Sequence, residues 1–431
     1  MCKYRDLEWG IDMCQCRNMS PTVEKRILFG LWVTILLILF SGMGMAQAPQ
    51  RESGVVPERD FQEEDLAQSA QPLKDEPLKL SGYVDGTYIY NFGPGSATNP
   101  LDFPTDTVPK GDMNLSALWL RLEKPLARGE SPDAGFQCGV MLGEDATYYA
   151  AVGTADEPSG PDSNSLYVGE AFAKIWIPDA QMEIWAGKFQ AVIGYETVWR
   201  PDNPCITFGI ADAFMPQDNI GVLAIFAPDP LFDIGVGVGN CSGAANDLGS
   251  DSVGDEFSVF SYIKIRNSEE NAMLQPGFYT TPSGTHGSNA RVDLDQNSYY
   301  AWNVIGEWSP IFAKEKWKLA FDATGGSGTG DPTHTEAPTT YATGGLYSTW
   351  YILDPISLTG RAEYVHTSNN AITQSTRLSG GDYYDYTLTL GVKITEELVW
   401  RGEGRFAWGA ELMTPTASAL WTAATEIYYR F

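Results

Sequence analysis

Hydrophobic and polar residues alternate along the chain from Leu80 to the last residue, and turn-forming clusters interrupt the alternation at intervals. In the first alternating segment Val84 and Tyr88 fall on one face, whereas Asp85 and Thr87 fall on the other. Successive side chains of a β-strand point to opposite sides, so a period of two predicts strands with one apolar and one polar face. The pattern favours an all-β protein whose strands separate an apolar from a polar environment.

The alternating segments are numerous and long. Each spans about 10 to 14 residues, whereas a strand of a soluble protein averages about 5 to 6. A strand tilted by about 45° needs about 9 to 11 residues to cross a bilayer. Marking every segment predicts sixteen strands, near residues 80–92, 112–123, 134–145, 167–177, 181–190, 217–227, 230–239, 255–266, 271–280, 298–308, 315–325, 341–353, 356–367, 382–393, 397–409 and 418–431.

The connections between these strands alternate between short turns, such as residues 178–180 and 354–355, and long polar loops. Outer-membrane barrels have short periplasmic turns and long external loops, and a sheet in a bilayer must close because its edges find no hydrogen-bonding partner there. We therefore expect a closed antiparallel transmembrane β-barrel of about 16 strands. A soluble jelly roll, propeller or sandwich is the alternative, but it would not require uniformly long strands with alternating loop lengths.

An export signal precedes the barrel. The basic pair Lys25 and Arg26 is followed by an apolar run over residues 27–40 and by a small-residue site at Ala46, the order found in secretory signal peptides. We expect cleavage after Ala46 and a true start at Met19; an uncleaved inner-membrane anchor is the alternative. The expected organisation is a signal peptide over residues 1–46 (1–18 being a mis-called upstream extension), a disordered acidic periplasmic tether over 47–78 and the barrel over 79–431.

Composition narrows the partners. The net charge of −27 argues against nucleic acid, whose binding needs clustered Lys and Arg. Three of the six cysteines precede the expected cleavage site. Cys205 and Cys241 fall in expected loops and could form a disulfide, whereas Cys138 falls in a strand as a small apolar filler. No zinc-type spacing is present in the mature chain, and we expect neither a metal site nor a cofactor.

The last strand ends on Phe431, with Ile427 and Tyr429 on the same face. A final strand that ends in aromatic-x-Phe resembles the recognition signal of bacterial outer-membrane barrels, which the assembly machinery reads by pairing with the exposed edge. The resemblance implies an outer-membrane location, contact with outer-membrane lipid and lipopolysaccharide, and the barrel assembly machinery as a partner.

One stretch, residues 185–196 (WAGKFQAVIGYE), resembles the mid-barrel segment of the OmpL-like beta-barrel porin family. In that family an opening strand like residues 80–85 and a later Gly-Val strand like residues 219–222 accompany it. The resemblance covers about residues 78–431 and implies a porin-like barrel, without implying a particular solute or a set of pore residues.

A barrel of about sixteen strands is too wide for its own side chains to fill, so it encloses an aqueous channel or a plug. No plug domain is visible, and we expect a passive porin for small hydrophilic solutes or ions. The third external loop, near residues 191–216, is the expected constriction if it folds inward. Its candidate residues are Glu196, Arg200, Asp202 and Asp212, with Trp199 and Phe208 as an apolar track.

Charged residues of both signs share the lumen-facing parity of their strands. Opposed rows of acidic and basic groups would produce a transverse field that orients polar solutes. The alternative is that they are simply paired charges of the wall, and a shift of one residue in register would turn any strand's set toward lipid. The wall candidates are Arg121, Glu170, Lys174, Arg361, Glu363, Arg401, Glu403 and Arg405.

Two other classes of function are open to a barrel. A barrel enzyme would need a nucleophile with a base, but His286, His334 and His366 are the only histidines and no GxSxG or HExxH motif accompanies them. We therefore expect no catalytic residues. A non-conducting barrel that binds surface ligands through acidic loops, such as residues 246–256, is the stronger rival. The solute, the ion preference, gating and assembly as a homotrimer are not fixed by the sequence.

Overall fold

The computed structural model describes residues 78–92, 113–152, 166–243, 258–281, 299–313, 316–328, 339–368, 371–372, 377–378, 380–409 and 419–431. The expected signal peptide and, apart from Leu78, the expected tether lie outside these residues. Within the described ranges no helix combines the length and the apolar character needed to span a membrane.

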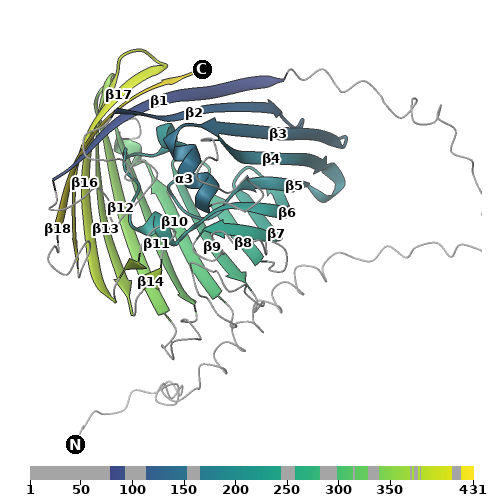
Figure 1. The fold of residues 1–431 in the computed structure, drawn as a ribbon. Helices are drawn as coiled ribbons and strands as arrows, with labels where there is room; N and C mark the ends of the chain where they lie inside the picture. Colours follow the sequence, from purple (N-terminus) through teal and green to yellow (C-terminus); the bar gives the residue numbers. More distant parts are fainter. Residues whose placement is uncertain are drawn as a thin grey trace, which may run out of the picture. The chain divides into compact units, whose positions relative to one another are not determined.

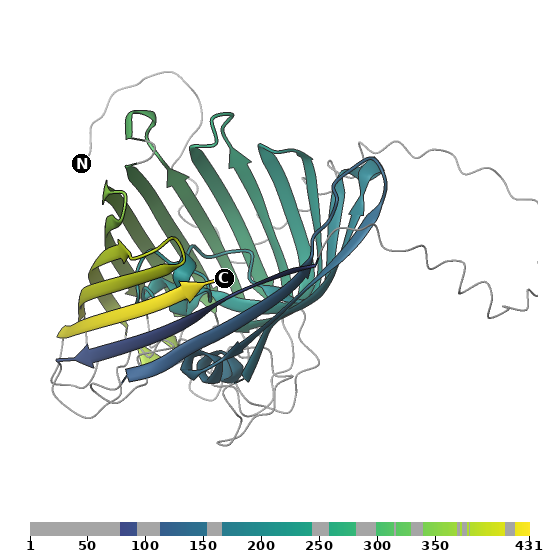
Figure 2. The same ribbon diagram turned by 90° about the horizontal axis from the view of Figure 1, so that it is seen from above.

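Sixteen antiparallel strands form a closed barrel in which neighbours along the chain pair with each other (Figures 1 and 2). The first and last strands close the ring, since Asp85 lies opposite Tyr428. The barrel strands are β1 (Lys79–Asn91), β2 (Met113–Lys124), β3 (Asp133–Leu142), β4 (Leu166–Ile177), β5 (Met182–Gln190), β6 (Pro216–Asp229), β7 (Phe232–Gly243), β8 (Ser258–Arg266), β9 (Ala272–Thr281), β10 (Tyr299–Trp308), β11 (Trp317–Gly328), β12 (Thr339–Leu353), β13 (Ile356–Thr367), β16 (Gly381–Lys393), β17 (Leu398–Gly409) and β18 (Ala419–Arg430).

The fold class expected from the alternation is confirmed, and the strand ends differ from the expected ones by at most four residues. Two connections that were expected to be loops contain an α-helix or a small sheet. Helix α3 (Glu144–Val152) follows β3, and its first turn carries Glu144 and Asp145, where negative charge stabilises a helix N-terminus. A two-stranded sheet of β14 (Ala371–Ile372) and β15 (Arg377–Leu378) lies between β13 and β16.

The barrel strands turn mainly apolar side chains outward, and many of their inward side chains are polar or charged. On β12 and β18 the outward Leu346 and Trp421 are 65% and 60% exposed, whereas the inward Arg361 and Glu363 of β13 are almost fully buried. An apolar outer band suits lipid, and a polar inner face suits a lumen. The alternation that predicts the strands therefore also predicts which way their side chains point.

Aromatic rings cover glycines on the inner face of the barrel. A Cβ atom on Gly235 or Gly237 of β7 would lie 2.2 or 2.1 Å from the rings of Tyr262 and Phe260 on β8. Phe260 in turn packs edge-on against Phe189, with ring centroids 6.0 Å apart. Glycine at these positions is needed because the rings occupy the space of a side chain. The inner wall from β4 to β8 therefore includes an aromatic layer.

The cysteines differ from expectation. Cys205 is a buried free thiol, so the disulfide that the sequence left open between Cys205 and Cys241 is not formed. Burial raises the pKa of the Cys205 thiol to about 12, which keeps it protonated at neutral pH. Cys241 belongs to β7 and not to a loop, although its side chain lies outside the described residues. Cys138 is exposed on the outward face of β3.

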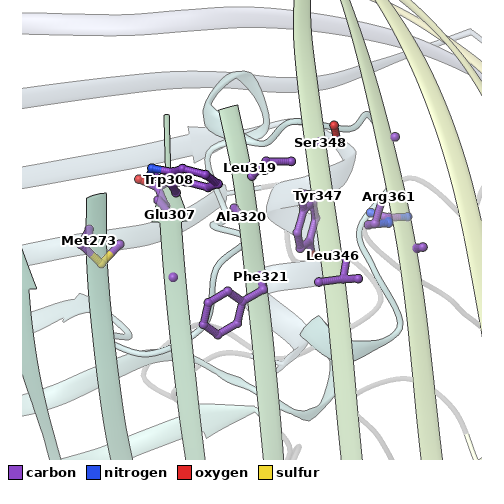
Figure 3. A pocket seen from close by; sticks show the side chains of 13 residues that line it. Met273, Glu307, Trp308, Leu319, Ala320, Phe321, Leu346, Tyr347, Ser348 and Arg361 are labelled. Atoms are coloured by element: carbon purple, nitrogen blue, oxygen red, sulfur yellow. The ribbon is translucent and has the colours of Figure 1, made fainter. Parts of the chain in front are cut away.

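A pocket of about 640 Å³ lies on the wall formed by β9 to β13 (Figure 3). Its lining alternates between the two faces of the sheet, and its exposed members Trp308, Phe321 and Leu346 belong to the outward set. The pocket therefore adjoins the apolar outer surface.

Candidate constriction loop

Residues 191–215 connect β5 to β6 and fold into the barrel; we call them the inner loop (Figure 2). Its first part is held by inward side chains of β10 and β11. The N–H of Gly194 donates to Asn303 Oδ1 (3.2 Å), and the N–H of Tyr195 donates to Asp322 Oδ2 (3.0 Å). The loop thus leaves β5 and crosses to strands well separated from it in the sheet.

Two wall glutamates accept hydrogen bonds from the backbone of the inner loop. Glu403 of β17 accepts from the N–H groups of residues 206 and 207 at 2.6 and 3.1 Å. Glu363 of β13 accepts from the N–H groups of residues 210 and 211 at 2.9 and 3.3 Å. Hydrogen bonds to an ionised acceptor are stronger than neutral ones, so each carboxylate fixes two consecutive peptide groups.

Two wall arginines hold the carbonyl groups of the same segment. The Arg361 guanidinium donates to the carbonyl of Thr207 (2.5 Å) and to Glu196 Oε1 (2.8 Å). The Arg401 guanidinium donates to the carbonyl of Asn203 (2.6 Å). On β13, and again on β17, an arginine and a glutamate lie two residues apart. Together they bind the carbonyl groups and the N–H groups of the loop backbone.

Arg200 lies at the centre of a buried charge cluster and is itself 0% exposed. It forms an ion pair with Asp145 of α3, donates to the carbonyl of Ile206 (2.7 Å) and lies 3.9 Å from Asp85 of β1. Burial alone would lower the pKa of Arg200, but the nearby carboxylates of Asp145 and Asp85 raise it. Burial raises the pKa of Asp145, and the Arg200 guanidinium opposes that rise. Arg200 therefore ties the loop to α3 and β1.

The acidic candidates of the loop separate into two environments. Glu196 is buried and accepts from the N–H of Gly209 (2.6 Å). Asp212 is half-buried, and burial and the Glu196 carboxylate raise its pKa. The Asp202 side chain is instead 53% exposed and forms an ion pair with Arg430 at 2.8 Å. Glu196 and Asp212 thus interact electrostatically, whereas Asp202 does not join them.

The two aromatic candidates also differ. Trp199 packs on Trp119 of β2, with ring centroids 3.7 Å apart, and Arg121 lies 4.8 Å from its centroid. Trp199 stays partly exposed, whereas Phe208 is 1% exposed beside Arg200. Only Trp199 is therefore placed to contact a solute.

The eight wall candidates fall into two groups. The group on β2 and β4 forms ion pairs within the wall, with Arg121 Nε 2.9 Å from Glu170 Oε2 and Lys174 Nζ 2.7 Å from Glu123 Oε1. The other group lies on β13 and β17, where four members bind the inner loop and Arg405 pairs with Asp385 of β16. Its members, all 7% exposed or less, are Arg361, Glu363, Arg401, Glu403 and Arg405.

Sequence reasoning missed several residues that hold the loop. Asp145 was assigned to the end of a strand, although an acidic pair that opens a helix was a usable signal. Asn303 and Asp322 carry no such signal, because their partners are backbone groups of a distant loop. In the part of the chain that the structure describes, no cluster of three or more His, Cys, Asp or Glu residues could hold a metal ion.

The family model described as Putative beta-barrel porin-2, OmpL-like, matches residues 77–427. The chain belongs to this family. The resemblance carried by residues 185–196 is therefore confirmed, and the protein is an outer-membrane porin. No curated protein matches the chain.

Solved outer-membrane structures share the fold. The outer membrane channel DcaP of Acinetobacter baumannii matches with a TM-score of 0.56 at 13% identity, over 82% of this chain and 97% of that chain. The trimer form of OmpT of Vibrio cholerae has a TM-score of 0.53 at 11% identity, over 82% and 99%. OmpF of Salmonella typhi in complex with daunomycin has a TM-score of 0.53 at 12% identity, over 82% and 97%. At such low identity the likeness concerns the barrel fold alone.

Proposed function

We propose that this porin lets small hydrophilic solutes or ions diffuse passively through its lumen, and that the inner loop is a fixed constriction. The observation that carries the proposal is the attachment of one continuous loop, by backbone N–H and carbonyl groups alike, to the inward faces of β13 and β17. A loop held by several charge-assisted hydrogen bonds to buried groups stays in place. It narrows the lumen and does not act as a gate.

The solute path in this proposal passes the exposed side chains of the wall of β2 to β5, beside the point where Trp199 of the inner loop packs on Trp119. The charges of β13 and β17 are covered by the loop, so they serve as anchors and do not face water. The side chains of Arg121 and Glu123 are each 27% exposed and can contact solutes. Glu196 and Arg200 are constriction residues in a structural sense, since they set where the loop lies.

Export, assembly and oligomeric state complete the proposal. We propose that the signal peptide over residues 1–46 directs export and that lipopolysaccharide and lipid contact the outer band. The assembly machinery would read the final strand, whose last residue, Phe431, exchanges backbone hydrogen bonds with Gly82 of β1 at 2.9 and 3.0 Å. A homotrimer is the assembly we favour, by analogy with the trimer form of a structural neighbour. We propose no catalytic activity.

Single-channel recording tests the proposal. The mature chain, starting at Gln47, is refolded and inserted into a planar bilayer, and the reversal potential is measured in a salt gradient. We expect stable conductance steps without voltage-independent flicker, because the loop is fixed. A chain that inserts and resists denaturant but never conducts would contradict the proposal and favour the surface-binding alternative.

A further inference from the structure

Two partly exposed tryptophan rings lie on or against the inner face of the wall of β2 to β5: Trp185 belongs to β5, and Trp199 belongs to the inner loop. Trp199 packs on Trp119, and Trp185 of β5 packs on Phe172 of β4 with ring centroids 4.7 Å apart. Trp119 and Phe172 are buried, whereas Trp199 and Trp185 keep part of their surface exposed. Each exposed tryptophan is thus fixed by a buried ring behind it. Water interacts poorly with aromatic rings, so a lumen that held only water would not need them.

Two ion pairs, each without net charge, lie beside these tryptophans. Arg121 pairs with Glu170, and Lys174 pairs with Glu123 and also donates to the Gln137 amide oxygen at 2.9 Å. Each pair offers donors and acceptors but no net charge. This part of the wall is therefore suited to groups that both donate and accept hydrogen bonds, and a charged solute would have to compete with a partner already present.

The two pairs lie at different heights on neighbouring strands of this wall. Glu170 lies opposite Gly139, which lies opposite Arg121, and Lys174 lies opposite Trp185. Four residues separate Glu170 from Lys174, a distance of about 13 Å along an extended strand. Trp199 lies beside Arg121 of the first pair, and Trp185 lies opposite Lys174 of the second.

We infer that this wall is a binding track for saccharides, that is, neutral ring-shaped solutes rich in hydroxyl groups; the inference rests on the proposed porin function. The C–H face of a sugar ring packs against the electron-rich face of an aromatic ring. Hydroxyl groups donate and accept, so they match the Arg121–Glu170 and Lys174–Glu123 pairs. Because Glu170 and Lys174 are about 13 Å apart along β4, the track is longer than one sugar ring, which favours an oligosaccharide over a single sugar.

The test is block of the single-channel current in KCl by maltotriose, compared with block by a polyethylene glycol of equal hydrodynamic radius. We expect saturable block by maltotriose alone. The variants Trp185→Leu and Trp199→Leu should each raise the dissociation constant of block about tenfold, whereas Trp185→Phe and Trp199→Phe should keep most of the affinity. Trp302→Leu is the matched control, because Trp302 is 44% exposed on the outward face of β10.

The outcomes separate the saccharide track from the porin function. A channel that conducts KCl, with maltotriose block that depends on Trp185 and Trp199 but not on Trp302, supports the track. Equal block by maltotriose and the polyethylene glycol, or block unaffected by the leucine variants, overturns it while the porin function stands. Stronger block by adenine than by maltotriose overturns the saccharide class in favour of planar aromatic solutes. Maltotriose block is compared only for leucine variants whose KCl conductance steps stay uniform. Where they do not, the phenylalanine variants are measured instead, and loss of block in them overturns the track.

Discussion

Two walls of the same barrel use the same pattern of charges for different purposes. On β2 and β4 the inward charges pair with one another; Arg121 and Glu123 of β2 are each 27% exposed, whereas their partners Glu170 and Lys174 are buried. On β13 and β17 an equally spaced set, Arg361 with Glu363 and Arg401 with Glu403, binds the backbone of the inner loop and is buried. An alternating charged strand therefore does not define a water-facing pore surface. What covers the strand decides whether its charges meet solute or hold structure.

The largest effect should come from breaking the covered wall at Arg361. Arg361→Met leaves the buried carboxylates of Glu196 and Glu363 without their cation, which should lower the free energy of unfolding by about 3–5 kcal/mol. The loosened loop should also give larger and noisier conductance steps. Denaturant unfolding and single-channel recording measure the two effects.

The matched control lies on the other wall. Arg121→Met removes a cation that is 27% exposed but leaves the Glu170 side chain, only 5% exposed, without it. The free energy of unfolding should therefore fall by about 1–3 kcal/mol, less than for Arg361→Met. Conductance steps should stay uniform in this variant. Equal losses for Arg361→Met and Arg121→Met would show that the two walls do not differ in the way described.

A pH series sharpens the comparison within the loop. Burial and the Glu196 carboxylate raise the pKa of Asp212, so the folded protein binds a proton at this group more tightly than the unfolded chain does. Ionisation of Asp212 therefore lowers the free energy of unfolding as pH rises from its ordinary pKa, about 3.9, through the raised value. Asp212→Asn should be more stable than the natural chain above that window and equal to it below. Unfolding curves from pH 4 to 8 test this, and an unchanged slope would contradict it.

The strands and the direction of their side chains could be predicted because both follow from a local period of two. Leu358 and Gly360 face outward and Arg361 and Glu363 inward, as alternation requires. The role of Glu363 could not be predicted in the same way, because its partners are peptide groups 152 and 153 residues away in an aperiodic loop. Backbone groups are the same at every position, so they leave no mark in the sequence. For this reason the sequence predicts where the loop lies, near residues 191–216, but not which wall charges it covers.

The smallest effect should come from the one loop charge that stays outside the buried network. Asp202 and Arg430 form an ion pair in which both side chains are about half exposed, at 53% and 44%. Water screens such a pair, so Asp202→Asn should change the free energy of unfolding by about 0–1 kcal/mol. The loop stays attached through Arg200 and Arg401, and conductance should therefore be unchanged. A large change in conductance in Asp202→Asn would mean that the position of the inner loop depends on the exposed Asp202 more than on the buried arginines. The contrast between buried and exposed charges would then fail inside the loop itself.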